Sequence, residues 1–157
     1  MKIIDVGRVT AVYSERCTAK VFFDDKNMVS PELPILTRGS QGVKDYWMPE
    51  VGEQVVCAFL ENTSKGGFIM GSFFNEVDRP PIDSDKKQHL QFPDGTYIEY
   101  DQDTHTLTVD VQGDITIKTA VAVHVEGDVI AEGVSLKNHT HTFYGSSGTT
   151  SGPLEGA

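Results

Sequence analysis

Residues 107–131 read LTVDVQGDITIKTAVAVHVEGDVIA, and most aliphatic side chains among them occupy odd-numbered positions. Successive side chains of a strand point to opposite faces, so one face of this extended chain is apolar over its whole length. Strands of globular proteins usually have about five or six residues, which makes this apolar face unusually long. The odd-numbered positions are Leu107, Val109, Val111, Ile115, Ile117, Val121, Val123, Val125, Val129 and Ala131.

The same stretch contains an internal repeat. Residues 111–115, VQGDI, recur as residues 125–129, VEGDV, at an offset of 14 positions. The Gly-Asp pairs predict bends, and a further bend fits at residues 119–120. Short strands joined by regular bends are typical of a β-helix. One narrow solenoid cannot bury its apolar face alone, whereas three identical chains around one axis can enclose it. The alternative is an ordinary β-sandwich, which fits the regular repeat poorly.

Two histidines, His139 and His141, follow this stretch at positions i and i+2. In an extended chain their imidazoles point to the same face. Two imidazoles make a poor structural metal site, because such sites take about four ligands or more. Three chains would bring six ring nitrogens together, which suits iron, nickel, copper or zinc. The alternative is that both histidines are solvated side chains of a polar tail.

The residues before these two histidines predict a hairpin and a later bend of the chain. Residues 96–100 and 107–111 predict a hairpin whose turn contains His105. His89 is expected at the surface, and His124, at an even-numbered position, is expected to face outward. After Gly133 the apolar residues move to even positions. This shift predicts a bend or bulge that redirects the chain just before His139.

Composition narrows the class of protein. The chain has 157 residues and a formal net charge of −10, which disfavours binding to a phosphate backbone. Apolar runs are shorter than the ~20 residues of a membrane helix, and residues 1–8 lack the apolar core of a signal peptide. Synthesis in the cytoplasm without a signal peptide is therefore expected. Cys17 and Cys57 lie in apolar or strand-like contexts and predict buried thiols of a reducing compartment.

The N-terminal part contains five short strand-like runs separated by turn signals. Five short strands in this length predict a small closed barrel of the OB type. The run with Pro34 belongs at a sheet edge or a strand start, and residues 54–60 predict a central strand. The runs are residues 6–13, 19–23, 33–36, 54–60 and 68–74.

Two segments of this part carry a family resemblance. Residues 46–55, YWMPEVGEQV, and residues 67–75, GFIMGSFFN, resemble the OB domain of the phage baseplate assembly protein V family, which is related to the spike proteins of type VI secretion systems. The Pro-x-x-Gly turn would lead the chain into the central strand. Trp47 is expected to pack over a barrel end. As an alternative, Trp47 would stack bases or sugars, but the clustered basic residues of such surfaces are absent.

A second resemblance concerns the C-terminus. Residues 127–141, GDVIAEGVSLKNHTH, resemble the end of baseplate spikes, where paired histidines of three subunits hold an iron ion near the tip. The resemblance implies that His139 and His141 are the metal ligands. Six-nitrogen octahedral coordination disfavours zinc, and magnesium and calcium prefer oxygen, so one iron ion per trimer is expected.

The predicted fold is therefore all-β, with an OB-fold barrel followed by an intertwined trimeric β-helix with a metal-bound tip. The barrel is expected over residues 1–78, a polar Pro-Pro linker over 79–91, the β-helix over 92–136 and the tip over 137–157. The tail, rich in Gly, Ser and Thr, is expected to fold back and cap the point.

The predicted function is structural. The chain is expected to form the homotrimeric central spike of a contractile phage tail or related injection device, at the virion baseplate or device tip. It would dock on tail tube and baseplate hub proteins, pierce the host envelope or outer membrane transiently, and bind no nucleic acid. It is not expected to be an enzyme.

Two alternatives belong to other classes. One is an OB-fold module that binds carbohydrate or nucleic acid. The other is a metalloenzyme that uses His139 and His141, although catalytic metal sites need a base nearby and the next acidic residue is Glu155.

Overall fold

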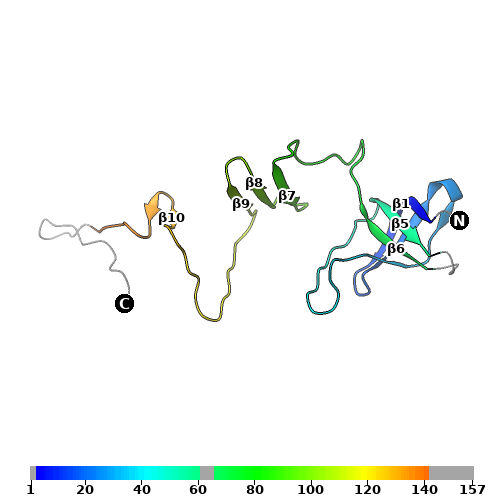
Figure 1. The fold of residues 1–157 in the computed structure, drawn as a ribbon, viewed down its shortest axis with the longest axis horizontal. Helices are drawn as coiled ribbons and strands as arrows, with labels where there is room; N and C mark the ends of the chain where they lie inside the picture. Colours follow the sequence, from blue (N-terminus) through cyan, green and yellow to red (C-terminus); the bar gives the residue numbers. More distant parts are fainter. Residues whose placement is uncertain (1–2, 61–65, 142–157) are drawn as a thin grey trace, which may run out of the picture. The chain divides into compact units, whose positions relative to one another are not determined.

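The computed structural model describes residues 3–60 and 66–141, and the chain divides into two compact units, Met1–Lys87 and Gln88–Ala157. Both units are built from antiparallel β-structure (Figure 1). Among the described residues, no helix is long and apolar enough to cross a membrane.

The N-terminal unit is one sheet in the order β3-β2-β1-β5-β6, with β4 also paired to β2. The five runs predicted as strands are all present, and Pro34, predicted at a sheet edge or a strand start, lies in a two-residue strand. A short helix, η1 (Asp24–Lys26), leads from β2 to the two-residue strand β3. The strands are β1 (Ile4–Tyr13), β2 (Thr18–Phe23), β3 (Met28–Val29), β4 (Leu33–Pro34), β5 (Gln54–Phe59) and β6 (Gly67–Ser72).

A parallel bridge between Ile35 and Ile69 joins the two ends of this sheet. The Leu36 N–H donates to the Ile69 carbonyl at 2.8 Å. The end of β4 thereby meets β6, and the strands close in the ring β1-β2-β4-β6-β5. Closure satisfies backbone groups that an open sheet would expose at its edges, which is the advantage of a small barrel.

The barrel core follows from the alternation of side chains along β1, β2, β5 and β6. Where β1 faces β2, a Cβ on Gly7 would lie 2.5 Å from Val21 Cγ1 and 2.6 Å from the Phe22 carbonyl, so only glycine fits. The predicted Pro-x-x-Gly turn ends at Gly52, whose φ of 100° favours glycine, and leads into β5. The buried apolar residues are Val9, Ala19, Val21, Phe23, Leu33, Ile35, Val55, Cys57 and Ile69.

Both cysteines are free thiols. Cys57 is buried in β5, and this burial, with a smaller contribution from the Asp5 carboxylate, raises the pKa of its thiol to about 11. Asp5 is only 6% exposed and forms an ion pair with Lys26. Cys17 lies in the turn after β1 and is half-buried, so the prediction of buried thiols is correct for Cys57 only.

The C-terminal unit begins with a three-stranded sheet, β7 (Lys87–Gln91), β8 (Tyr97–Asp101) and β9 (Thr106–Asp110). The predicted hairpin is confirmed as β8–β9, with His105 at a positive φ of 53° in its turn. Strand β7 lies within the segment predicted as a linker. His89 on β7 is not a surface residue as expected: its side chain is 9% exposed.

After β9 the chain runs without regular strands to a small hairpin of β10 (Ile130–Ala131) and β11 (Val134–Ser135) (Figure 1). Bends occur at residues 112–113, 120–121 and 126–127, which confirms the bends predicted at both Gly-Asp pairs and places the third one residue later than expected. Odd-numbered aliphatic side chains between the bends are exposed, with Ile117 at 71% and Val121 at 93%.

The core assignment gives a first prediction. The Leu33 side chain is fully buried, whereas Leu36 is 50% exposed. Leu33→Ala should lower the free energy of unfolding of the barrel by about 2–5 kcal/mol, because it removes buried methyl groups and leaves a cavity. Leu36→Ala is the matched control and should lower the free energy of unfolding by less than about 1 kcal/mol. Denaturant titration followed by fluorescence of the single tryptophan, Trp47, measures both, and equal losses would contradict the assignment.

Candidate functional site

The candidate site lies beyond a tight hairpin. In this hairpin Ile130 pairs with Ser135 and Ala131 with Val134. The two residues between the strands, Glu132 and Gly133, have positive φ values of 50° and 85°. Positive φ at both positions is typical of the primed turns that connect antiparallel strands. The bend predicted from the parity shift is therefore a full reversal of the chain.

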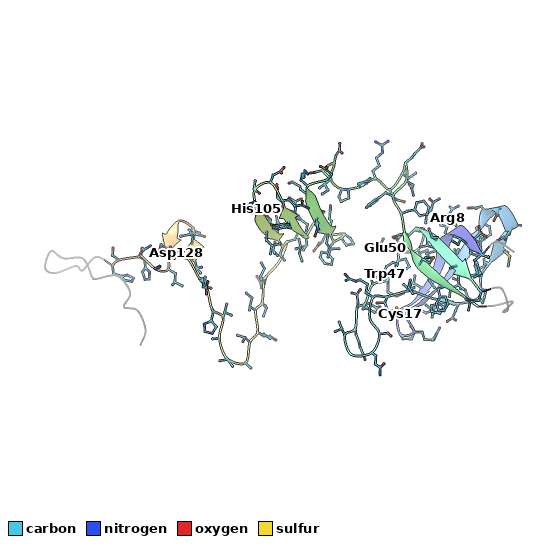
Figure 2. All side chains as sticks on the ribbon, in the orientation of Figure 1. Arg8, Cys17, Trp47, Glu50, His105 and Asp128 are labelled. Atoms are coloured by element: carbon cyan, nitrogen blue, oxygen red, sulfur yellow. The ribbon has the colours of Figure 1, made fainter. Side chains whose placement is uncertain are left out.

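The Asp128 carboxylate closes the base of this hairpin (Figure 2). Its Oδ1 accepts hydrogen bonds from the Val129 N–H at 2.8 Å and the Lys137 N–H at 3.0 Å. Its Oδ2 accepts one from the Ser135 hydroxyl at 2.5 Å. The Ser135 hydroxyl, followed by the Lys137 N–H, lowers the pKa of Asp128, so the carboxylate stays ionised at neutral pH.

His139, the first predicted ligand, is held by the chain just before it. Its N–H donates to the Ser135 carbonyl at 3.1 Å. Its Nδ1 lies 3.1 Å from the Ser135 carbonyl and 3.0 Å from the Leu136 carbonyl. Carbonyl oxygens only accept hydrogen bonds, so Nδ1 carries the proton of the neutral ring and Nε2 carries the lone pair. A ring nitrogen with a free lone pair is what a metal ion binds, and a backbone carbonyl on the other nitrogen is a frequent support of such ligands.

His141, the second predicted ligand, lies next to His139. The ring centroids are 5.2 Å apart and the rings are nearly perpendicular, at 86°. The backbone thus brings both predicted residues together. In the part of the chain that the structure describes, no group of three or more His, Cys, Asp or Glu side chains is placed to hold a metal. The described residues therefore offer two nitrogen donors at this place, fewer than the four or so ligands that a structural metal site takes.

The remaining histidines have other environments. His89 Nδ1 lies 2.9 Å from Glu99 Oε2, and its ring stacks on Tyr97 with centroids 5.1 Å apart. His105 and His124 are exposed. None of the three joins His139 and His141 in a cluster among the described residues.

Trp47, the candidate stacking platform, packs against the barrel core as predicted. Its indole N–H donates to the Leu36 carbonyl at 3.0 Å. The two cations that precede it most closely in sequence are Arg38 and Lys44, and Arg38 pairs with Asp45 at 2.6 Å. The half-buried indole supports the core and the chain at Leu36, which gives no sign of a binding platform for bases or sugars.

Comparison with known proteins agrees with the barrel. Residues 7–74 match the Type VI secretion system/phage-baseplate injector OB domain. The N-terminal barrel therefore belongs to this family of injector domains, which confirms the resemblance found in residues 46–55 and 67–75. The chain is also 33% identical over 104 residues to the spike protein of Escherichia phage P2. That alignment covers 66% of this chain and 46% of the relative, so the chain spans about half the length of this curated relative.

Sequence reasoning missed Asp128 and Ser135 as residues of the candidate site. The repeated Gly-Asp pair was interpreted only as a bend. A carboxylate seven residues before a serine has no periodic signature, so only the folded hairpin reveals their contact.

Proposed function

We propose that this protein is the structural central spike of a contractile phage tail or a related injection device. In this role it sits at the tail baseplate or device tip, acts as a homotrimer, and pierces the host envelope. The observation that carries the proposal is the uncovered apolar face between β9 and β10, in a chain whose barrel is an injector OB domain.

The apolar face begins on the sheet of the C-terminal unit. Across the β8–β9 ladder, Ile98 pairs with Val109 and Tyr100 with Leu107, and all four side chains are exposed. The opposite face carries Glu99 and other half-buried polar residues. Leu107 and Val109 also begin the odd-numbered stripe, so one apolar surface continues from the sheet into the bent segment.

Large exposed apolar surfaces mark interaction sites. The stripe is regular and bent at nearly even spacing, and a second and third copy would present the same pattern about a common axis. Three chains wound together as a β-helix would bury the stripe in a closed, dry interior, and continuous strand pairing would give the shaft its stiffness.

In the proposed trimer, His139 and His141 of three chains hold one iron ion through six ring nitrogens. The bound ion would supply a cross-link between three chain ends that otherwise fray. The arrangement of Nδ1 of His139 against two carbonyls supports Nε2 as its donor atom. The proposed tip spans residues 137–157, of which residues 142–157, with the proposed cap, lie outside the described residues.

The proposed division of labour assigns docking on tail tube and hub proteins to the barrel over residues 1–78. Residues 79–91 connect it to the spike over residues 92–136. The proposed spike has no enzymatic activity, because its role is to transmit axial force.

The trimer proposal predicts a clear difference between neighbouring positions. Val123→Asp should abolish trimer assembly, because three carboxylates would meet in a dry interior. His124→Asp, at the adjacent outward position, should leave the trimer intact. Sedimentation of both variants measures the result, and residues 79–157 expressed alone should remain trimeric. A monomeric wild-type chain would contradict the proposal.

The metal proposal predicts about a third of an iron per chain in protein purified without a nickel column. The double change His139→Ala, His141→Ala should remove the metal and leave the trimer assembled, since the aliphatic stripe lies before the site. Native mass spectrometry reports subunit number and bound metal together. Metal that persists after the double change would show that these residues are not the ligands.

The structural role predicts that the pure protein cleaves neither peptidoglycan nor other glycans. Particles assembled without the protein should fail to complete a functional tail or to deliver their contents. Release of soluble sugar from purified cell walls would instead favour an enzyme. Particles that lack the protein and still infect would contradict the spike role.

A further inference from the structure

We infer that Asp128 and Ser135 are positioning residues that fix the imidazole ring of His139 for metal binding. This inference rests on the metal site of the proposed function. The two side chains form what we call the tip latch: the carboxylate of Asp128 and the hydroxyl of Ser135, which lies on β11. Neither residue contacts a metal in this scheme, and both act through the backbone that carries His139.

The latch joins the two ends of the hairpin. Asp128 precedes β10, and its Oδ1 accepts the N–H of Lys137, nine positions later. The Leu136 N–H donates to the Val129 carbonyl at 2.9 Å, so backbone and side-chain bonds close the same loop. The hairpin itself is only two residues long on each strand. A hairpin this short is marginal by itself, so these added bonds are what hold its ends together.

Ser135 passes this constraint on to the histidine. Its hydroxyl donates a hydrogen bond to Asp128 and accepts one from the Asn138 N–H at 2.8 Å. The hydroxyl therefore acts as both donor and acceptor and links the carboxylate to the backbone just before His139. Its carbonyl accepts the backbone N–H of His139 and lies 3.1 Å from Nδ1 of the same residue. The contacts that link the Asp128 carboxylate to the His139 imidazole therefore run through Ser135 and residues 136–138.

The internal repeat supplies a comparison within the same chain. Asp114 occupies the position in the first Gly-Asp pair that Asp128 occupies in the second. Asp128 accepts three hydrogen bonds, whereas Asp114 makes none among the described residues. The bend needs only the Gly-Asp turn, since the chain bends at both places. The additional bonds of Asp128 occur only where the chain leads to His139, which separates the latch from the bend.

The chemical consequence concerns the choice of ring nitrogen. In a neutral histidine either nitrogen can carry the proton, and a metal binds the other one. The carbonyls of Ser135 and Leu136 keep the proton on Nδ1 and leave Nε2 for the metal. Loss of supporting contacts around a metal-bound histidine typically costs about 10- to 100-fold in metal affinity. Three copies of the latch would act on one shared ion.

The experiment uses the full-length protein with iron(II) as the probe. Ser135→Ala removes the hydroxyl, and Asp128→Ala removes the carboxylate. Ser135→Thr keeps a hydroxyl on a side chain that suits a strand position. Asp114→Ala is the matched control at the repeat position. Chelator competition measures iron affinity, sedimentation measures assembly, and ¹⁵N NMR of the metal-free protein reports which ring nitrogen of His139 carries the proton.

The expected result is a trimer for every variant. Iron affinity should fall about 10- to 100-fold in Ser135→Ala and Asp128→Ala, and stay near wild type in Asp114→Ala and Ser135→Thr. In the two weakened variants the proton of His139 should be shared between both nitrogens, while the wild type keeps it on Nδ1. A merely structural role of the latch would not change this proton distribution.

Two failures are distinguishable. If the wild type binds iron and Ser135→Ala and Asp128→Ala bind it equally well, the positioning role is overturned and the proposed function stands. If the wild type binds no iron, the metal part of the proposed function is overturned. In that case a proton that leaves Nδ1 only in the latch variants supports the latch as the device that orients this ring, and an unchanged proton overturns it.

Discussion

The apolar stripe from Leu107 to Val129 is the constraint on which the rest of the chain depends. Its side chains are exposed among the residues that the structure describes, and Val121 is 93% exposed. Burial of apolar surface contributes roughly 25 cal/mol per Å², so a stripe of this length represents a large free-energy gain that a single copy cannot realise. The barrel differs in that its strands surround one filled interior, although it too exposes apolar side chains such as Ile4 and Val6. Under the proposed trimer the two units therefore differ: the barrel core is filled within one chain, and the stripe would be covered by other copies.

Each part of the chain closes its exposed backbone in a different way. The barrel closes through the bridge between Ile35 and Ile69, which leaves its ring of strands without an open seam. The small hairpin before the histidines closes through the Asp128 carboxylate. The bent segment between β9 and β10 has no regular strand in the described chain, and in the proposed trimer it would pair with other copies. The barrel and the hairpin thus close locally, whereas the bent segment is the part that the proposed assembly would close.

Much of the fold could be predicted because it leaves periodic or turn-specific signals. Strand-like runs bounded by turn signals predicted β1, β2, β5 and β6. The Gly-Asp pairs predicted the bends, and the Pro-x-x-Gly pattern predicted the turn at Gly52. The burial of His89 against Tyr97 and Glu99 could not be predicted. A strand shows the same alternation of polar and apolar residues whether its polar side chains face water or pack against other side chains. The barrel seam and the contact of Asp128 with Ser135 depend on how segments distant in sequence meet. The spacing of His139 and His141 gave the pair, but not the nitrogen that each ring presents.

A metal site shared by three chains places a stronger demand on positioning than a site within one chain. Fixing a flexible side chain on binding costs about 0.5–1.5 kcal/mol, and a six-histidine site would have to fix six of them at once. Rings already oriented by their own backbone lose less freedom when the ion binds. His139 meets this condition within its own chain, because two carbonyls hold Nδ1 and the segment that provides them is tied to Asp128. If the proposed trimer forms, the local hairpin and the shared site would act together: each chain would orient its ligand before assembly, and assembly would supply the remaining ligands.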